Sequence, residues 1–136
     1  MKSVLTASIA AAGLALIAAP ASADDHGEMS KGETKLAKML EGRVAGEPER
    51  CIRTIGGRGL RVIDGTAIVY RRGDTIWVNR TKNPAHLDDN DLLEIRRFSA
   101  SQLCRMDQVS THDRFVGHYT GNIFLTDFVP YRLADS

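Results

Sequence analysis

Residues 60–79, which read LRVIDGTAIVYRRGDTIWVN, decide the fold class. They contain three runs rich in β-branched and aromatic residues, at positions 60–63, 66–70 and 75–79. Asp64-Gly65 separates the first two runs, and a loop with Gly73 separates the second two. Such spacers between runs of this kind are typical of β-hairpins. The segment therefore predicts three antiparallel strands, because a parallel crossover needs a dozen or more residues.

Strand-like patterns continue towards the C-terminus. Weak patterns occupy residues 92–98, 106–111 and 115–119. A stronger pattern occupies residues 123–129, and Pro130 is expected to end it. Residues 101–105 are expected to form a short helical turn. Together these patterns predict a mainly β fold that forms a small antiparallel barrel or sandwich.

One helix is expected before the strands. Ser30 and Glu33 have the spacing of a capping box, in which both side chains accept hydrogen bonds from the first free amides of a helix. Apolar residues then follow at helical spacing up to Val44, and Pro48 forbids continuation. We expect a helix over residues 32–44 that covers the sheet, within a single domain at 32–136.

The first residues have the pattern of a secretory signal. Lys2 gives a basic start, residues 4–19 are almost continuously apolar, and Ala21-Ser22-Ala23 supplies the small residues of a peptidase site. The apolar run is shorter than the roughly 20 residues that span a bilayer. We therefore expect removal of residues 1–23, a polar tail at 24–31, and a periplasmic or secreted product without a transmembrane segment.

The charge balance excludes one class of partner. Loss of Lys2 with the leader leaves equal numbers of acidic and basic residues. Nonspecific nucleic-acid binding needs a surplus of Lys and Arg. Nucleic acid is therefore not an expected partner.

Cys51 and Cys104 are the only cysteines in the chain. An even count in an exported protein favours a disulfide between them. A metal-thiolate pair and a catalytic thiol are the alternatives, although neither cysteine has further metal ligands at local spacing. In the chain-entropy model, a cross-link between these positions stabilises a domain by about 4 kcal/mol.

Cleavage after Ala23 would create a candidate metal site at the new N-terminus. The processed chain would begin Asp24-Asp25-His26. A free amine with histidine at the third position offers four nitrogens in one plane, which is the geometry that Cu(II) and Ni(II) prefer. The pattern predicts copper or nickel binding that needs no fold. The alternative is a charged tail whose third residue is histidine by chance.

Two histidines lie near carboxylates in the C-terminal half. A small hydrolase could use His112 or His118 beside Asp107 or Asp113. However, adjacent residues on a strand point to opposite faces, and the sequence contains no nucleophile elbow or zinc-binding helix motif. We therefore favour solvent-exposed histidines and keep a hydrolase as an alternative.

Arg71-Arg72 and Arg96-Arg97 form two basic pairs. If the strands brought them to one face, they could bind an anionic glycan, a lipid head group or an envelope protein. The alternative, which we favour, is that they are charged edge residues that prevent sheet-to-sheet aggregation.

Five short motifs occur in an order that points to one family. They are Cys51-Ile52, Arg61-Val62-Ile63-Asp64, Trp77-Val78-Asn79, Gln102-Leu103-Cys104-Arg105-Met106-Asp107 and Phe128-Val129-Pro130-Tyr131. Over residues 45–132, the chain resembles a family of small exported bacterial proteins catalogued as a domain of unknown function. The resemblance implies a β-rich fold stabilised by cysteines, and it implies no reaction.

Members of that family often carry further cysteines near the positions of Asn83 and Asn122, and this chain lacks both. The absence of both cysteines is what we expect if they form a second disulfide in other members of the family and this protein lacks that bond. The resemblance therefore implies that Cys51 and Cys104 are mutual partners. The resemblance supports the exported location and the fold. Our own expectation is a non-enzymatic binding or envelope-associated role, with copper or nickel binding and hydrolysis as the alternatives.

The metal-binding hypothesis leads to a direct prediction. A protein that begins at Asp24 should bind Cu(II) and develop a visible absorption band during titration, because the amine, two amides and the imidazole surround the ion. His26→Ala should abolish the band. N-terminal sequencing of the exported protein identifies the cut, and a cut elsewhere or a blocked amine would contradict the hypothesis.

Overall fold

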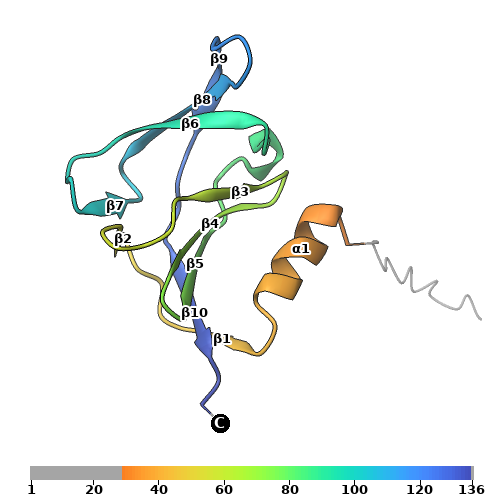
Figure 1. The fold of residues 1–136 in the computed structure, drawn as a ribbon, viewed down its shortest axis with the longest axis vertical. Coiled ribbons are helices and arrows are strands. Elements are labelled where there is room, and N and C mark those ends of the chain that lie inside the picture. The colour runs from red at the N-terminus through yellow and green to blue at the C-terminus, as the bar shows by residue number, and fades with distance from the viewer. Residues whose placement is uncertain (1–28, 136) are drawn as a thin grey trace, which may run out of the picture.

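The computed structural model describes residues 29–135 (Figure 1). The expected signal at 1–23 and the candidate metal ligands Asp24, Asp25 and His26 lie outside the described residues. The elements follow in the order α1 (Lys31–Met39), β1 (Arg43–Ala45), β2 (Cys51–Arg53), β3 (Arg61–Ile63), β4 (Ala67–Arg72), β5 (Thr75–Asn79), the 3-10 helix η1 (Pro84–His86), β6 (Asp91–Arg96), β7 (Gln102–Cys104), β8 (Gln108–Asp113), β9 (Tyr119–Ile123) and β10 (Val129–Leu133). In this part of the chain, no helix combines the length and the apolar content needed to cross a bilayer.

Five strands form the main sheet, in the order β1-β10-β5-β4-β3, and all neighbours are antiparallel. The segment 60–79 supplies β3, β4 and β5, so the predicted meander is confirmed. Gly73 has a φ of 56°, a left-handed conformation that favours glycine, and it begins the two-residue turn between Arg72 and Thr75.

Two smaller sheets complete the fold. One contains β6, β8 and β9, and the other pairs β2 with β7, where Cys51 lies directly opposite Cys104. These two residues form the expected disulfide, which excludes the metal-thiolate and catalytic-thiol alternatives.

The sheets do not close into a barrel, so of the two expected architectures the sandwich-like one describes the molecule better.

Both faces of the main sheet are buried. Ile68 and Tyr70 of β4 pack with residues of the two smaller sheets, whereas Ala67 and Val69 pack with Leu36 of α1. Alternate residues of a strand point to opposite faces, so the continuous apolar run of β4 serves two cores. Figure 1 shows α1 beside the main sheet and apart from β6, β8 and β9.

The start of α1 uses half of the predicted capping box. The Glu33 N–H donates to Ser30 Oγ at 3.2 Å, as expected. The Glu33 carboxylate instead accepts two hydrogen bonds from the Arg80 guanidinium, at 2.6 and 3.0 Å. The hydrogen bonds from Arg80 lower the pKa of Glu33. This pair ties α1 to the chain that follows β5.

The end of α1 differs from the prediction. The helix stops at Met39 rather than at residue 44. Gly42 has a φ of 69°, and this left-handed residue turns the chain out of the helix into β1. Val44 therefore lies in a strand, and its apolar side chain is exposed.

Three predictions in the C-terminal half are also wrong. Residues 102–104 form β7 instead of a helical turn, because they pair with β2. The pattern at 115–119 lies mostly in the turn before β9. Pro130 lies inside β10 rather than ending a strand; it pairs with Trp77 of β5, and its carbonyl accepts the Gly46 N–H at 2.7 Å just beyond the end of β1.

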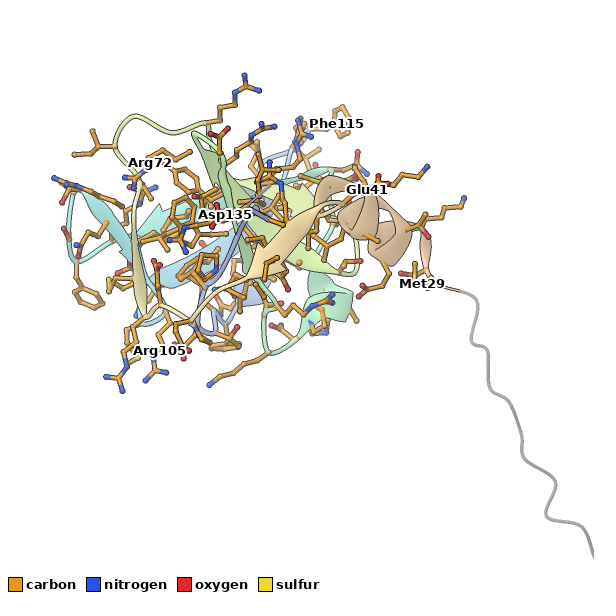
Figure 2. All side chains as sticks on the ribbon, turned by 90° about the horizontal axis from the view of Figure 1, so that it is seen from below. Met29, Glu41, Arg72, Arg105, Phe115 and Asp135 are labelled. Carbon is orange, nitrogen blue, oxygen red and sulfur yellow. A yellow bond between two sulfur atoms is a disulfide. The ribbon has the colours of Figure 1, made fainter. Side chains whose placement is uncertain are left out.

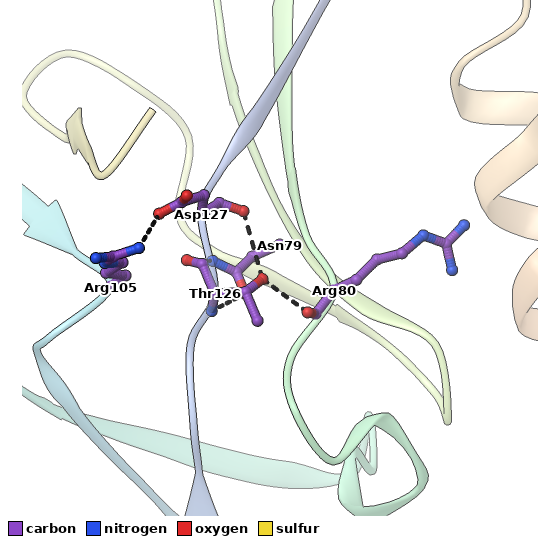
Figure 3. Close-up of polar contacts among 5 residues, drawn as sticks. All are labelled: Asn79, Arg80, Arg105, Thr126 and Asp127. Carbon is purple, nitrogen blue, oxygen red and sulfur yellow. Dashed lines mark hydrogen bonds and ion pairs between the residues drawn. The ribbon is translucent and has the colours of Figure 1, made fainter. Parts of the chain in front are cut away.

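The apolar run at 123–129 is not one strand, and Asn79 accounts for this. Ile123 ends β9 and Val129 begins β10, so residues 124–128 cross between two sheets. The side chain of Asn79 is fully buried. Its Nδ2 donates to Thr126 O at 2.8 Å, and its Oδ1 accepts from Thr126 N at 3.0 Å (Figure 3). A side-chain amide thus replaces strand pairing at this point.

Reduction of the Cys51–Cys104 disulfide is expected to lower the free energy of unfolding by about 4 kcal/mol, because the cross-link removes conformational entropy from the unfolded chain. Urea denaturation with and without a reductant, repeated on the double variant Cys51→Ala/Cys104→Ala, measures the loss. A loss below about 1 kcal/mol would contradict the entropic estimate.

Asn79→Ala is expected to lower the free energy of unfolding by about 2 kcal/mol, because the Thr126 amide and carbonyl lose partly buried partners. Asn122→Ala is the matched control. Its exposed side chain makes no hydrogen bond to residues 29–135, so the expected change is below about 0.5 kcal/mol. If both variants lowered the free energy of unfolding equally, the Asn79 hydrogen bonds would not account for the effect of Asn79→Ala.

Candidate functional site

Strand β8 separates polar from buried side chains. Val109 and Thr111 are buried, while Gln108, Ser110 and His112 point to the opposite face. This separation follows from the two-residue repeat of a β-strand. The sheet of β6, β8 and β9 therefore has an outer side that is rich in polar groups.

Strand register brings residues from the neighbouring strands beside those of β8. Glu94 of β6 and Asn122 of β9 both lie opposite Ser110, and Tyr119 lies opposite His112. The rings of Tyr119 and His112 meet edge to face, with centroids 5.9 Å apart. We use the name outer face for Glu94, Arg96, Gln108, Ser110, His112, Tyr119 and Asn122.

The outer face lines a pocket of about 640 Å³. The other walls come from the turn between β7 and β8, which carries Arg105 and Met106, and from Lys82 and Phe124. The last two are neighbours because the Lys82 N–H donates to Phe124 O at 2.9 Å. Pockets that bind small molecules have roughly 300–1,000 Å³, so this one is large enough for such a ligand.

His112 is the histidine that lies in this pocket. Its Nε2 is 3.3 Å from Glu94 Oε2 and 3.4 Å from Ser110 Oγ. In a hydrolase triad, the carboxylate holds one ring nitrogen while the other takes the serine proton. Here both neighbours contact the same nitrogen, so this geometry does not activate Ser110 as a nucleophile.

Asp107 lines the pocket but has a structural role. It is only 5% exposed. Its Oδ2 accepts from Cys104 N at 2.7 Å, and its Oδ1 accepts from Phe98 N at 3.1 Å. Both carboxylate oxygens therefore hold the turn between β7 and β8 and are committed to backbone groups.

Asp113 and His118 lie in the hairpin that joins β8 to β9. Asp113 Oδ1 accepts from Val116 N and Phe115 N, each at 2.8 Å, and these bonds lower the pKa of Asp113. Phe115 projects from the surface of the molecule (Figure 2). His118 is exposed and lines neither of the two pockets described for residues 29–135.

The two arginine pairs have different surroundings. Arg71 Nε donates to Gly73 O at 3.4 Å, and the Arg72 guanidinium lies 5.5 Å from the centre of the Trp77 ring. Arg96 lines the pocket, with Nε 3.5 Å from Glu94.

Arg97 donates to Thr54 Oγ1 at 2.8 Å and lines a second pocket, which also includes Arg61 and Arg114. Only Arg96 of the four predicted anion-binding arginines therefore lies at the larger pocket. Arg96 is the last residue of β6 and Arg97 follows the strand, and the two side chains line different pockets. Anion binding by the other three arginines stays a prediction.

Asp64, Asp88 and Asp89 form an acidic cluster that sequence reasoning missed. One oxygen from each lies within 4.8 Å of the others, and all three side chains are exposed. The Gly65 N–H donates to Leu87 O at 2.8 Å, which brings the two loops together. Exposed carboxylates alone do not define a metal site, so we assign no ligand to this cluster.

Asn83 and Asn122 are neighbours in the fold. Asn83 Nδ2 donates to the Asn122 carbonyl at 3.2 Å and also lies 3.0 Å from His86 Nδ1. Asn83 thus ties the loop after β5 to the edge of β9, beside the pocket.

The sequence could have revealed part of the outer face. The alternation in residues 91–96 and 108–113 indicates which residues share one side of a strand. It does not indicate that β6 and β9 flank β8, so Glu94 and Asn122 could not be placed beside Ser110. Lys82 and Phe124 come from irregular segments without a periodic signal.

Comparison with known proteins adds no further identification. No family model, no curated protein and no solved structure matches the chain.

Proposed function

We propose that the processed chain is an exported, non-enzymatic binding protein and that the outer face is its ligand site. The leader pattern supports export. The disulfide is compatible with it, because such bonds persist in oxidising compartments outside the cytosol. Components of the cell envelope are the ligands that an exported protein of this kind would meet.

The pocket beside the outer face is the observation that carries the proposal. Ligand sites combine apolar surface with a few well-placed polar groups. Here Glu94, Ser110 and Asn122 form a polar row across three paired strands. Phe124 and Met106 add apolar surface at the walls, and both side chains are exposed. A protein gains no stability from large exposed apolar groups, so a ligand that covers them would benefit from their burial.

The contacts of the pocket side chains favour binding over hydrolysis. Ser110 lacks a correctly placed base, because His112 Nε2 is shared with Glu94. Asp107 is only 5% exposed and each of its oxygens accepts a backbone N–H, which favours a structural role over that of a general base. These groups instead offer fixed donors and acceptors to a ligand that leaves unchanged.

The proposal predicts where ligands bind. The processed, disulfide-bonded protein would be labelled with ¹⁵N and titrated with a fragment library that contains neutral, anionic and cationic members. Fragments that bind should shift the amide signals of the outer face, and they should be recovered chemically unchanged. Ser110→Trp should abolish these shifts, because the indole would cover the polar row at the centre of the outer face.

Thr34→Trp, on the exposed side of α1, is the matched control and should bind as the parent does. Shifts confined to the second pocket, or no binding fragment at all, would overturn the proposal. Product formation from a fragment would support the hydrolase alternative instead.

A further inference from the structure

We propose that the pocket at the outer face takes an acidic saccharide, that is, a sugar chain carrying carboxylate or phosphate groups. This inference rests on the proposed binding function and names the class of ligand. Three properties of the pocket lead to it: neutral groups that donate and accept, exposed rings at the walls, and cations without full partners.

The neutral polar groups suit hydroxyl groups. Gln108 and Asn122 have exposed amide side chains that make no hydrogen bond to residues 29–135. Ser110 Oγ has only a 3.4 Å contact, with His112. A sugar hydroxyl both donates and accepts, and amide and hydroxyl side chains do the same. A row of such groups across paired strands therefore matches successive hydroxyls of a sugar ring.

The rings at the walls suit the C–H faces of sugars. Tyr119 is 55% exposed and Phe124 is 57% exposed, although both line the pocket. The Lys82 N–H donates to Phe124 O at 2.9 Å, so a basic residue and an aromatic residue lie next to each other along one wall. Aromatic groups provide apolar area at a low entropy cost. A ligand with alternating polar edges and apolar faces would use both kinds of surface.

The charges indicate an acidic ligand. Lys82 is exposed and forms no ion pair with the described residues, and Arg96 uses only Nε in its contact with Glu94. Arg105 also lines the pocket, where one of its terminal nitrogens contacts Asp127 at 3.0 Å. Of the acidic lining residues, Asp107 is turned towards the backbone, and only Glu94 is exposed. Arginine and lysine leave free donors that suit a carboxylate or phosphate group.

Other ligands fit the pocket less well. A free phosphate ion is far smaller than about 640 Å³ and would not contact the rings. A fatty acyl chain would leave the amides of Gln108 and Asn122 without partners. Nucleic acid binding relies on many phosphate contacts, which the balanced charge of the processed chain does not favour.

The test compares three probes on the processed, disulfide-bonded protein by calorimetry and ¹⁵N NMR. They are a tetramer of galacturonic acid, a neutral maltotetraose and inorganic phosphate. The acidic tetramer should bind at least about tenfold more tightly than the neutral one, since a charge-assisted hydrogen bond contributes about that factor. Its amide shifts should lie at the outer face.

Variants separate the parts of the site. Lys82→Ala and Arg96→Ala should each weaken the acidic tetramer about tenfold. Lys35→Ala on α1 and Arg53→Ala on β2 are matched controls on exposed positions, and they should leave its affinity unchanged. Phe124→Ala should weaken both tetramers, because it removes the surface for the sugar ring. Thermal denaturation checks that each variant is folded.

Each outcome decides a different point. Equal affinity for the two tetramers would overturn the requirement for an acidic group. If inorganic phosphate bound as tightly as the acidic tetramer, the proposal that the ligand is a saccharide would be overturned. If no saccharide binds while library fragments still shift the outer face, the ligand class is wrong and the proposed function stands. If neither binds, both proposals fail.

Discussion

The buried side-chain amide of Asn79 is the contact on which the pocket depends. It lies at the end of β5 and holds both backbone polar groups of Thr126, where the chain passes from the three-stranded sheet to the main sheet (Figure 3). Phe124 lies just before Thr126 and lines the pocket. Asp127 lies just after Thr126 and contacts Arg105, which also lines the pocket. A buried amide is costly to leave unpaired, so this contact, together with the bond from the Lys82 N–H to Phe124 O at 2.9 Å, fixes the path of the wall.

The wall formed by the turn between β7 and β8 is held by different means. Cys104 ends β7 and is bonded to Cys51, and the buried carboxylate of Asp107 accepts the N–H groups of Cys104 and Phe98. The turn that carries Arg105 and Met106 is therefore restrained covalently at one end and by hydrogen bonds at the other. A pocket whose walls are already ordered loses little conformational entropy when a ligand binds, which is consistent with a binding role.

Sequence patterns predicted the local structure well where neighbours along the chain determine it. The run 75–79 forms β5 with the predicted bounds, and the turn with Gly73 forms as expected. Predictions failed where a distant partner decides. Residues 102–104 are extended because β2 lies alongside them, and the apolar run 123–129 is divided because Asn79 binds its middle. Neither partner has a fixed distance along the chain that a pattern could reveal.

The sequence by itself determined the hairpins, the start of the helix, the cysteine pair and the alternation of polar and apolar residues along each strand. These properties follow from turn chemistry, capping, a single possible pairing and the two-residue repeat of extended backbone. Only the tertiary structure decided that Glu94, Ser110 and Asn122 form one row and that Arg96 joins them without Arg97. The reason is that a strand's repeat assigns its side chains to faces, whereas the packing of the whole core selects which strands become neighbours.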